Sequence, residues 1–549
     1  MKDRRIREVV SISWSRFFCF TIFIVFSCVL FTGFTFSSFR LFGETFRPVL
    51  ISSWRNSAME AISDDLDASP SIEIRETVIF PDQFVIFLYY PSSLSLFTKD
   101  DLHCSYFHPN STQPQLKLPP VGINIQNPNH QIIRCPVSST GVITSLSLKS
   151  KGQLPRMPPP HSWDFLVYEA VLDRDNTTIV FVKGLNLRPD RLADSSRYEC
   201  VYGWDFEKPR LLLTSEVISA AQEIVSCKTP LSVLSSLNKS IKVSVKVKRR
   251  GILHSVARLD YRLVSDSGDQ KKYEMCVCTM VRNQARFMRE WVMYHARIGV
   301  QRWFIYDNNS EDAIDEEIES LERSGYRITR HVWPWIKTQE AGFAHCALRA
   351  RESCEWVGFF DVDEFLHFPS GISLQNVLRN QTVGFDQVGE VRILCHSFGP
   401  SGLKKVPSQG VSVGYTCRLA SPERHKSIVR PETLNSSLIN VVHHFHLREG
   451  VDYINVDKAL MVINHYKYQV WEVFKEKFQR RVATYVVDWM SEQNEGSRDR
   501  VPGLGTRALE PANWSSSFCE VTDTGLRRHV LKMFANRRTN RLQWQEDDA

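Results

Sequence analysis

The chain has no stripe of lysine and arginine with interleaved aromatic residues, which is the pattern expected of a nucleic-acid-binding surface. Its net charge is only +7 over 549 residues. The thirteen cysteines are too dispersed for a small disulfide scaffold, and no closely spaced Cys/His sets indicate zinc. These absences speak against nucleic acid as a partner and against a zinc-centred fold. What is present is an ordinary globular composition, 43% apolar and 23% charged, in a chain long enough for about three domains.

The first forty residues predict a membrane anchor. Residues 17–39 carry no charge, which fits the ~20 apolar residues needed to cross a bilayer. A secretory signal peptide has a shorter apolar core, of roughly 7 to 15 residues, followed by a small-residue cleavage site. We therefore expect a single uncleaved transmembrane helix. The basic residues of segment 1–16 place that end in the cytosol, so the chain after Arg40 is expected in the secretory lumen, as a single-pass type II membrane protein.

Seven Asn-x-Ser/Thr sequons agree with a lumenal location. Chance alone supplies several in a chain of this length, so they are supporting evidence only. Asn308 lies where we place the nucleotide below, and we expect it to remain unmodified. The other six are predicted glycosylation sites: Asn110, Asn176, Asn238, Asn380, Asn435 and Asn513.

Residues 40–71 have the small polar composition of a stem, and residues 72–264 consist of short apolar runs separated by turns. The run 241–247 alternates strictly between apolar and polar residues. The region is therefore predicted to be a β-sandwich or a pair of small sheets. Its role is left open between a spacer domain and a carbohydrate-binding domain that uses aromatic side chains such as Trp204.

A similar cysteine pattern occurs twice in this β-rich region, on either side of the stiff proline-rich segment 155–160. In an oxidising lumen the economical interpretation is two local disulfides, although sequence alone does not fix the connectivity. The predicted pairs are Cys104 with Cys135 and Cys200 with Cys227.

Residues 270–495 alternate between strands and helices. The expected strands are 274–281, 302–306, 326–332 and 356–360, and the expected helices are 286–298, 312–323 and 338–355. Such alternation predicts a mainly parallel sheet, and in such sheets the loops at the carboxyl ends of the strands bind the ligand.

The stretch 356–365, WVGFFDVDEF, is the one around which the chain is organised. A buried strand runs into three carboxylates within four positions. A bare Asp-x-Asp is most often only a polar strand end. Here Asn283 and Asp307 follow two earlier strands, so these polar side chains are expected at one sheet edge. Asp361 and Asp363 are two apart and can face one Mg²⁺ or Mn²⁺ that also holds a diphosphate.

Several motifs together resemble glycosyltransferase family 92 over about residues 273–490. They include MVRN at 280–283, EWVMYH at 290–295, FIYDNNS at 304–310, WVGFFDVDEF at 356–365 and FGPSG at 398–402. The resemblance implies an α/β GT-A fold, which is Rossmann-like, with a UDP-sugar donor, a divalent metal and inversion at the anomeric carbon. Plant members are Golgi type II membrane proteins that include galactan β-1,4-galactosyltransferases. Residues 72–264 resemble, more weakly, the carbohydrate-binding domain that precedes the catalytic domain of plant galactan synthases.

The same resemblance assigns roles to the polar edge. Asn283 and Asp307 are expected to hold the uridine, and Asp361 and Asp363 to hold the ribose, the diphosphate and the metal, Mn²⁺ or Mg²⁺. A metal that bridges the phosphates stabilises the charge that grows on departing UDP. The attacking sugar hydroxyl needs a carboxylate base, to which no residue is assigned. Side chains alternate along an extended chain, so Glu364 is expected to point away from Asp363 and to be structural.

Residues 441–446 are an apolar stretch with three histidines, expected to be a strand. A lone histidine is most often packed in a core, whereas the resemblance makes His443 the leading late metal ligand, and neutral imidazole tolerates Mn²⁺. Arg424, Lys426 and Arg430 precede it. These cations either meet the diphosphate or belong to a solvated basic loop.

A helix is expected to open at residues 464–468 and to continue past Val482 with one apolar face. His465 and Tyr466 at its start are placed to reach the sugar or the acceptor. Residues 496–549 are polar and irregular, so a poorly ordered C-terminal segment is expected.

The leading hypothesis is a Golgi membrane glycosyltransferase that adds a sugar, with galactose as first candidate, from a UDP donor to a cell-wall glycan. Homo-oligomer formation is left open. A phosphatase with an Asp-x-Asp nucleophile is disfavoured, because that motif usually lies on the first strand and is followed by Thr or Val, whereas Glu364 follows here. A non-catalytic glycan-binding protein with a transferase-like domain remains the alternative.

Overall fold

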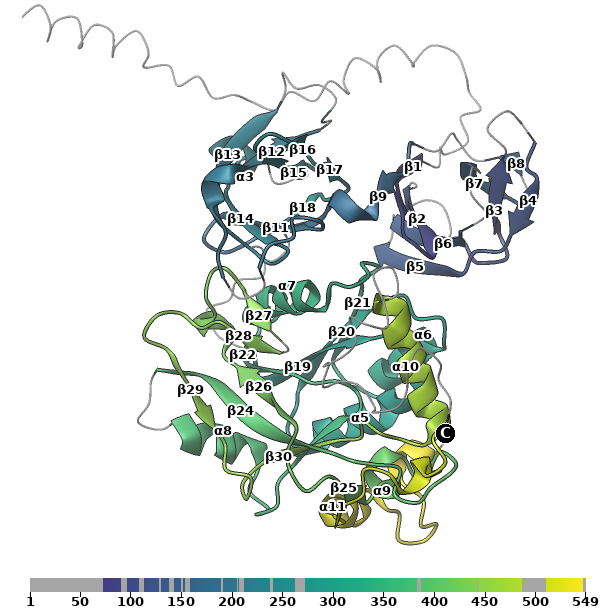
Figure 1. Cartoon of the computed structure of the whole chain (residues 1–549), viewed down its shortest axis with the longest axis vertical. Coiled ribbons are helices and arrows are strands. Elements are labelled where there is room, and N and C mark those ends of the chain that lie inside the picture. The colour runs from purple at the N-terminus through teal and green to yellow at the C-terminus, as the bar shows by residue number, and fades with distance from the viewer. Residues whose placement is uncertain are drawn as a thin grey trace, which may run out of the picture. The chain divides into compact units, whose positions relative to one another are not determined.

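A computed structural model gives the structure of the chain (Figure 1). It describes residues 73–89, 96–107, 113–127, 130–137, 143–149, 152–153, 158–188, 191–204, 206, 212–236, 240–261, 272–382, 387–441, 443–485 and 510–546. Among these residues, no helix has the length and apolar character needed to cross a bilayer. The anchor expected over 17–39, the stem over 40–71 and the sequons at Asn110 and Asn238 lie outside them.

One mixed sheet organises the C-terminal half, in the order β21-β20-β19-β22-β26-β24-β30-β23, with β29 beside β24. Its strands are β19 (Tyr273–Val281), β20 (Arg302–Asp307), β21 (Ile328–Val332), β22 (Cys354–Phe359), β23 (Glu364–His367), β24 (Val388–Ser397), β26 (Arg424–Val429), β29 (Asp452–Asn455) and β30 (Val462–His465). The first four in spatial order are parallel, as the alternation of strands and helices predicts. The remainder is mixed, because β26 runs antiparallel to both β22 and β24.

Helices cover both faces of this sheet (Figure 1). They are α5 (Ala285–Ile298), α6 (Ile314–Arg323), α7 (Gln339–Arg351), α8 (Leu374–Thr382), α9 (Val411–Gly414) and α10 (Trp471–Tyr485). Alternate residues of a strand face opposite ways. Met275 and Val277 of β19 pack in the core with α5 and α6, whereas Cys276 and Cys278 pack in a second core with α7. Helix α5 ends at Gly299, whose φ of 117° is left-handed and favours glycine.

The first part of the β-rich region is a β-sandwich, as its alternating runs predict. Its two sheets have the orders β5-β6-β2-β1-β9 and β4-β3-β7-β8. The strands are β1 (Glu73–Ile79), β2 (Gln83–Tyr89), β3 (Leu102–Phe107), β4 (Leu116–Leu118), β5 (Gly122–Asn127), β6 (His130–Pro136), β7 (Ile143–Leu148), β8 (Gly152–Gln153) and β9 (His161–Ser162). The disulfide between Cys104 on β3 and Cys135 on β6 joins the two sheets within their shared core.

The second part of the region adds one larger sheet, in the order β16-β15-β12-β13-β14-β11-β10-β17, with β18 beside β10. Its elements are β10 (Leu166–Leu172), β11 (Thr177–Val182), β12 (Tyr198–Gly203), β13 (Leu213–Ala221), β14 (Ile224–Lys228), α3 (Leu231–Leu234), β15 (Lys242–Val247), β16 (Gly251–Ile252), β17 (His254–Ser255) and β18 (Leu259–Asp260). Cys200 on β12 is joined to Cys227 on β14. Both disulfides of the β-rich region are the pairs that the sequence predicts.

The β-rich region and the mixed sheet of the C-terminal half share a hydrophobic core. Trp335, which follows β21, lies with its ring centroid 5.5 Å from that of Trp163 and 5.1 Å from that of Tyr168. Its indole Nε1 donates a hydrogen bond to Glu169 Oε1 at 3.1 Å. The same core cluster includes apolar residues of β11, β19, β20 and α7. The boundary expected between 264 and 270 therefore separates the β-rich region from the mixed sheet and its helices. The two sides nevertheless share one hydrophobic core.

Two helix predictions are wrong in their bounds. The helix expected over 338–355 ends at Arg351, and Cys354 already begins β22, because the residues between them form a turn that no glycine or proline marks. The helix expected from 464–468 begins at Trp471 instead. Residues 464 and 465 belong to β30, since their backbone pairs with β23 and β24, and residues 466–470 belong to neither element.

The stretch 441–446 is not a single strand. Its residues belong to β27 (Asn440–Val441) and β28 (His444–Phe445), which pair with each other in the antiparallel sense. His443 lies at the turn between them with φ of 74°. Of this stretch, His443 and Phe445 are buried and Val441 and His446 are exposed, and the apolar pattern could not show the reversal of the chain.

The irregular C-terminal segment expected over 496–549 is also wrong for the part that the structure describes. Residues 510–546 contain β31 (Val521–Thr522) and helix α11 (Gly525–Phe534). The apolar face of α11 packs in the main core, and a disulfide joins Cys417 on β25 (Cys417–Arg418) to Cys519. Tertiary packing and this cross-link order a segment whose local sequence is polar.

Candidate active site

The polar strand ends foreseen from the sequence lie at one edge of the sheet. Strands β20 and β22 both pair in the parallel sense with β19, so the carboxyl ends of the three strands point the same way. Asn283 follows β19, Asp307 ends β20, and Asp361 and Asp363 follow β22. The site is therefore assembled from four residues on three neighbouring strand ends.

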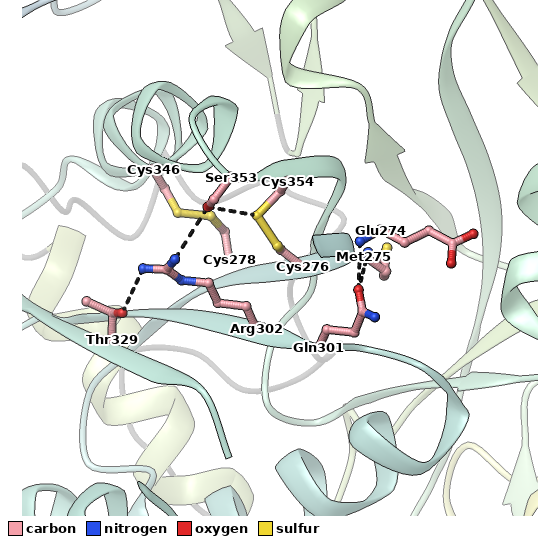
Figure 2. The surroundings of a disulfide bond; sticks show 10 residues. All are labelled: Glu274, Met275, Cys276, Cys278, Gln301, Arg302, Thr329, Cys346, Ser353 and Cys354. Atoms are coloured by element: carbon pink, nitrogen blue, oxygen red, sulfur yellow. Dashed lines mark hydrogen bonds between the residues drawn. A yellow bond between two sulfur atoms is a disulfide. The ribbon is translucent and has the colours of Figure 1, made fainter. Parts of the chain in front are cut away.

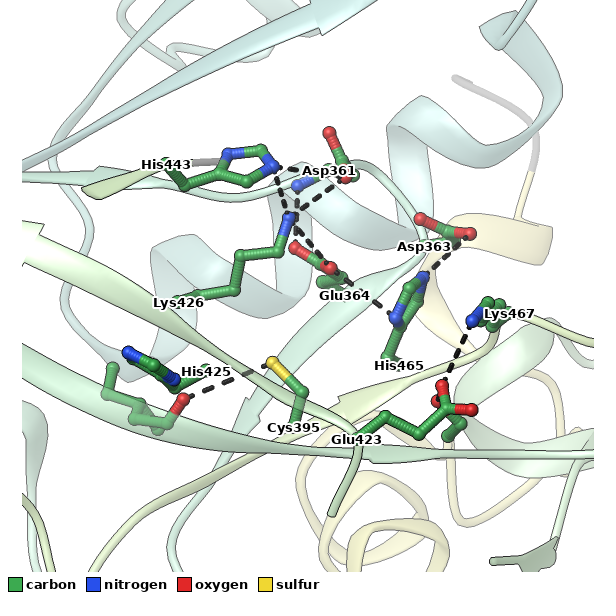
Figure 3. Close-up of polar contacts among 12 residues, drawn as sticks. Asp361, Asp363, Glu364, Cys395, Glu423, His425, Lys426, His443, His465 and Lys467 are labelled. Carbon is green, nitrogen blue, oxygen red and sulfur yellow. Dashed lines mark hydrogen bonds and ion pairs between the residues drawn. The ribbon is translucent and has the colours of Figure 1, made fainter. Parts of the chain in front are cut away.

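Asp361 lies over a buried lysine (Figure 3). Lys426 Nζ donates to Asp361 Oδ2 at 3.0 Å, and 34% of the aspartate side chain remains exposed. Burial alone would raise the pKa of Asp361, but the neighbouring ammonium outweighs it and lowers that pKa to about 2. Asp361 is therefore an ionised carboxylate that faces the edge of the site.

Asp363 is held from the other side of the same turn. Its carboxylate pairs with Lys477 of helix α10, and Oδ2 lies 3.6 Å from His465 Nε2. Burial would raise the pKa of Asp363, yet these two groups hold it well below its usual range. Its backbone carbonyl accepts the N–H of Tyr466 at 2.8 Å. His465 thus lies at the site, although on a strand end rather than a helix start. The side chain of Tyr466 is 1% exposed and packs in the main core, so the expectation that it reaches the sugar or the acceptor is wrong.

Glu364 is buried beneath the two aspartates. Its Oε2 accepts the backbone N–H of Asp361 at 3.0 Å, and its Oε1 lies 3.0 Å from Lys426 Nζ and 3.5 Å from His465 Nδ1. Burial raises the pKa of Glu364 despite the lysine. The carboxylate therefore fixes the turn that presents Asp361, in agreement with the structural role expected for it.

His443 reaches the same buried lysine. Lys426 Nζ donates to His443 Nε2 at 2.7 Å, and that nitrogen is 3.9 Å from Asp361 Oδ2 (Figure 3). Burial and the adjacent ammonium lower the pKa of His443 to about 3, so its ring is neutral. Its neighbour His444 turns away and pairs with Glu390 at 2.8 Å. Of the three clustered histidines, His443 is the one beside Asp361.

The three cations that precede the histidines separate along β26. Lys426 is buried and pairs with Asp361, so it does not belong to a solvated loop. Arg430 lies past the end of this antiparallel strand, 3.8 Å from Glu355 and over the ring of Trp356, at the start of β22. Arg424, at the beginning of β26, is exposed. Arg430 is therefore far along β22 from the proposed diphosphate position.

Asn283 supports the loop that follows β20. Its backbone N–H donates to Ser310 Oγ at 3.0 Å, and its Oδ1 accepts the N–H of Glu311 at 2.7 Å. Both Asn283 and Asn309 have positive φ, 52° and 63°. We call residues 307–311 the donor loop, because the resemblance places the uridine there.

Asp307 is a buried support of the donor loop. Its Oδ1 accepts the backbone N–H of Ser310 at 3.0 Å, and its Oδ2 accepts from Arg330 Nε at 3.1 Å. The side chain is 1% exposed, so a uridine contact would require Arg330 to move. The amide of Asn308 donates to the carbonyls of Trp333 and Trp335, so the sequon expected to remain unmodified has its nitrogen engaged.

Comparison with known proteins decides the family. Residues 271–501 match the model of glycosyltransferase family 92. A glycosyltransferase family 92 protein of Ricinus communis is 60% identical over 99% of this chain and 100% of its own length. The chain belongs to glycosyltransferase family 92. The resemblance found in the sequence is thereby confirmed, and the protein is a glycosyltransferase.

Two more distant similarities accompany this result. A galactan β-1,4-galactosyltransferase of Arabidopsis thaliana, GALS3, is 29% identical over 22% of this family 92 chain and 27% of its own length. The crystal structure of S. aureus TarS 1-349 overlays on 40% of the chain and 68% of its own, with 14% identity and a TM-score of 0.23. An overlay at that level carries no argument about fold or ligand.

The residues of this family 92 site include the types of side chain that bind a divalent metal. Carboxylate oxygen and neutral imidazole suit Mn²⁺, and carboxylates suit Mg²⁺. Within the described part of the chain, no three His, Cys, Asp or Glu side chains are grouped so as to hold an ion. Asp361, with 34% of its side chain exposed, is the carboxylate of this site that is open to solvent. His443 can join it only when Lys426 moves, because the ammonium contacts both side chains.

Two disulfides in the core between the sheet and α7 were not predicted from the sequence (Figure 2). Cys276 is joined to Cys354, and Cys278 to Cys346. Cys276 and Cys278 are two apart on β19 and therefore point to one face. That spacing in a strand, together with a later cysteine on helix α7 and another at the start of β22, was the available signal. The bonds tie β19 to β22 and to α7.

Proposed function

We propose that this family 92 enzyme transfers a sugar from a UDP-sugar to a cell-wall glycan, with inversion, in a reaction that depends on Mn²⁺ or Mg²⁺. The observation that carries the proposal is the carboxylate pair Asp361 and Asp363, which follows β22 at the sheet edge where Asn283 and the donor loop also lie. Both carboxylates are held ionised by lysines, so the edge offers negative charge to a cation that accompanies a diphosphate.

Each described residue of the edge has a defined task in this proposal. Asn283 shapes the donor loop that would face the uridine. Asp361 and Asp363 would hold the metal, with His443 as the third candidate ligand. When bound, the metal would supply stabilisation of the negative charge on the leaving UDP. Glu364 is not the base that activates the acceptor, because it is 1% exposed, its Oε2 accepts the backbone N–H of Asp361 and its Oε1 is ion-paired with Lys426.

Galactose is the first candidate for the transferred sugar. The support is the 29% identity to a galactan β-1,4-galactosyltransferase over 22% of this chain. The aligned segment is too short to identify the donor sugar, since one or two contacts in the pocket decide between epimeric sugars. A comparison of donors therefore has to make the choice.

We place the acceptor glycan in a cleft of about 740 Å³ between the β-rich region and the catalytic part. The cleft is within the size range of ligand sites, and it offers carboxylates, amides and an aromatic edge to sugar hydroxyls and ring faces. Its lining includes Asp164, Phe165, Lys183, Gln222, Glu340 and Val441. Gln222 Nε2 donates to the carbonyl of Asn440 at 2.6 Å, so the cleft ends on the hairpin that carries His443. Trp204, expected as a sugar-binding aromatic, does not line it.

The proposed location is the Golgi membrane, in the single-pass type II orientation. The uncharged segment 17–39 supports an anchor, and five disulfides among the described residues support an oxidising lumen. The side chains of Asn176, Asn380 and Asn513 are exposed, which glycosylation of their sequons requires.

The proposal is tested by incubating the full chain, purified in detergent, with a panel of UDP-sugars in Mn²⁺ and again in EDTA. We expect one UDP-sugar to be hydrolysed faster than the others and the activity to disappear in EDTA. A protein that binds glycan but neither binds UDP nor hydrolyses any donor would be the non-catalytic alternative. For the cleft, Glu340→Ala should weaken transfer to long acceptors and leave donor hydrolysis unchanged, whereas Leu231→Ala, at a position 83% exposed and outside the cleft, should change neither.

A further inference from the structure

A cation from the N-terminal β-sandwich lies against the donor loop. Arg134 belongs to β6 and is 1% exposed. Its Nη1 donates to the backbone carbonyl of Asn309 at 3.2 Å, and its Nη2 to that of Ser310 at 2.8 Å. The carboxylate of Glu311 lies 3.9 Å from Nη1. One guanidinium from the β-rich region thus contacts three consecutive residues of the donor loop.

The sandwich is shaped to hold this arginine in place. Gly122 on β5 pairs with Arg134 in register, and a Cβ atom at Gly122 would lie 2.2 Å from Nη2. A side chain there would occupy the space of the guanidinium. The residue after Arg134 is Cys135, whose disulfide to Cys104 anchors β6 to the opposite sheet. The strand register, the absence of a side chain at Gly122 and the disulfide together fix the direction of the Arg134 side chain.

The donor loop is held on its other side by the catalytic part. Asn283 accepts the N–H of Glu311 and donates its own N–H to Ser310 Oγ, at 2.7 Å and 3.0 Å. Buried carbonyls that lack donors are costly, so the loop depends on Arg134 to satisfy two of them. The planar fork of an arginine presents two N–H groups to two carbonyls in a fixed geometry, whereas a lysine offers a flexible point charge. A loop that is already ordered does not have to be ordered by its ligand.

We propose that Arg134 is a positioning residue for the nucleotide donor, and that the β-sandwich completes the donor site by fixing the donor loop. The inference rests on the proposed function, because it takes the nucleotide to be UDP. It gives the β-rich region a role in donor binding that is separate from any contact with the acceptor.

The test measures UDP affinity in Mn²⁺ by titration calorimetry, together with donor KM and kcat, on the full chain. Arg134→Met should raise the UDP Kd and the donor KM about tenfold or more while kcat stays within about threefold of wild type. Arg134→Lys should give a smaller rise. Gly122→Ala, which keeps the charge but displaces it, should resemble Arg134→Met. Lys117→Met, at an exposed position on β4 of the same sandwich, is the matched control and should change nothing.

The outcomes separate this inference from the proposed function. A wild-type protein that does not bind UDP refutes the proposed function. A wild-type protein that binds UDP, with unchanged Kd and donor KM in folded Arg134→Met and Gly122→Ala, overturns the inference, even where their thermal midpoints fall. If Arg134→Met does not fold, Arg134→Lys and Gly122→Ala decide by the same criterion.

Discussion

Lys426 Nζ lies 3.0 Å from Asp361 Oδ2 and 3.0 Å from Glu364 Oε1, so one buried ammonium holds two carboxylates at the end of β22. The side chain of Lys426 is 7% exposed, and the two carboxylates raise its pKa although burial opposes them. The ammonium also contacts His443. It is the charge around which this part of the site is built.

Removal of this charge should destabilise the fold. Lys426→Met leaves Glu364 buried without its counter-charge, and breaking a buried ion pair from one side costs about 3–5 kcal/mol. The free energy of unfolding, measured by urea titration at pH 7, should fall by that amount. Lys475→Met, at an exposed position on α10, is the control and should stay within about 0.5 kcal/mol of wild type. Equal stabilities of the two variants would contradict the buried pair.

A buried histidine predicts how stability changes with pH. His295 on α5 is fully buried, and its Nδ1 donates to the carbonyl of Trp291 at 2.8 Å. Burial lowers its pKa from about 6.5 to about 4. Between those values the unfolded chain binds a proton that the folded chain does not, so the free energy of unfolding falls as the pH falls. This residue alone should account for a loss of about 2–3 kcal/mol between pH 7 and pH 4.5.

The measurement compares urea unfolding of wild type and His295→Gln at both pH values. The variant should lose about 2–3 kcal/mol less on acidification than wild type, whatever its stability at pH 7. His446→Gln, at an exposed position, should lose as much free energy of unfolding between the two pH values as wild type does. If His295→Gln and wild type lose the same free energy, the depressed pKa of this histidine is refuted.

The strands and helices of the catalytic sheet could be predicted because their periodicity is local. Strand 274–281 and helix 286–298 were placed to within a residue or two of β19 and α5. The shared sheet edge followed from one general rule about parallel strands. What depended on pairing between distant segments could not be foreseen, and Lys426 is the clearest case. It lies 65 residues from Asp361 in sequence and comes beneath it only through the antiparallel register of β26 with β22.

The shared edge of the candidate residues was predicted from the sequence, but the partners of these residues were not. Asp307 was expected to face the uridine, yet its carboxylate accepts a hydrogen bond from Arg330 on the neighbouring strand. Arg134 had no motif at all, because its partners are backbone carbonyls about 175 residues away. Backbone acceptors carry no side-chain signature, so only the folded structure can show such a contact.

Loss of one aspartate should stop the reaction while sparing the fold. Asp363→Asn removes the charge but keeps the shape, and it leaves Lys477 with 22% of its side chain exposed to water. Hydrolysis and transfer of the UDP-sugar should fall at least ~100-fold, a typical effect of losing one preorganised electrostatic contact. The thermal midpoint should fall below that of Asp452→Asn, an exposed control on β29, because the ion pairs of Asp363 contribute to stability, but the variant should still unfold in a cooperative transition. Near wild-type turnover by the variant, or full turnover of the wild type in EDTA, would contradict the proposed metal site.

Removal of the β-rich region should prevent folding of the catalytic part. A chain that begins at Ser265 lacks Trp163, Tyr168 and the rest of the apolar cover on Trp335. Each large side chain that loses its burial costs about 1.5–3 kcal/mol, so several such losses consume most of the ~5–15 kcal/mol by which a domain is stable. The shortened chain should be insoluble, or soluble without a cooperative thermal transition.

The matched control for this truncation begins at Ile72, after the predicted anchor and stem, and keeps the shared core intact. It should melt cooperatively and hydrolyse the UDP-sugar. A folded chain from Ser265 that hydrolyses the donor as fast as this control would show that the two regions are independent. If it also extended long and short acceptors equally well, the β-rich region would serve neither the acceptor cleft nor the donor loop, since both depend on residues that this chain lacks.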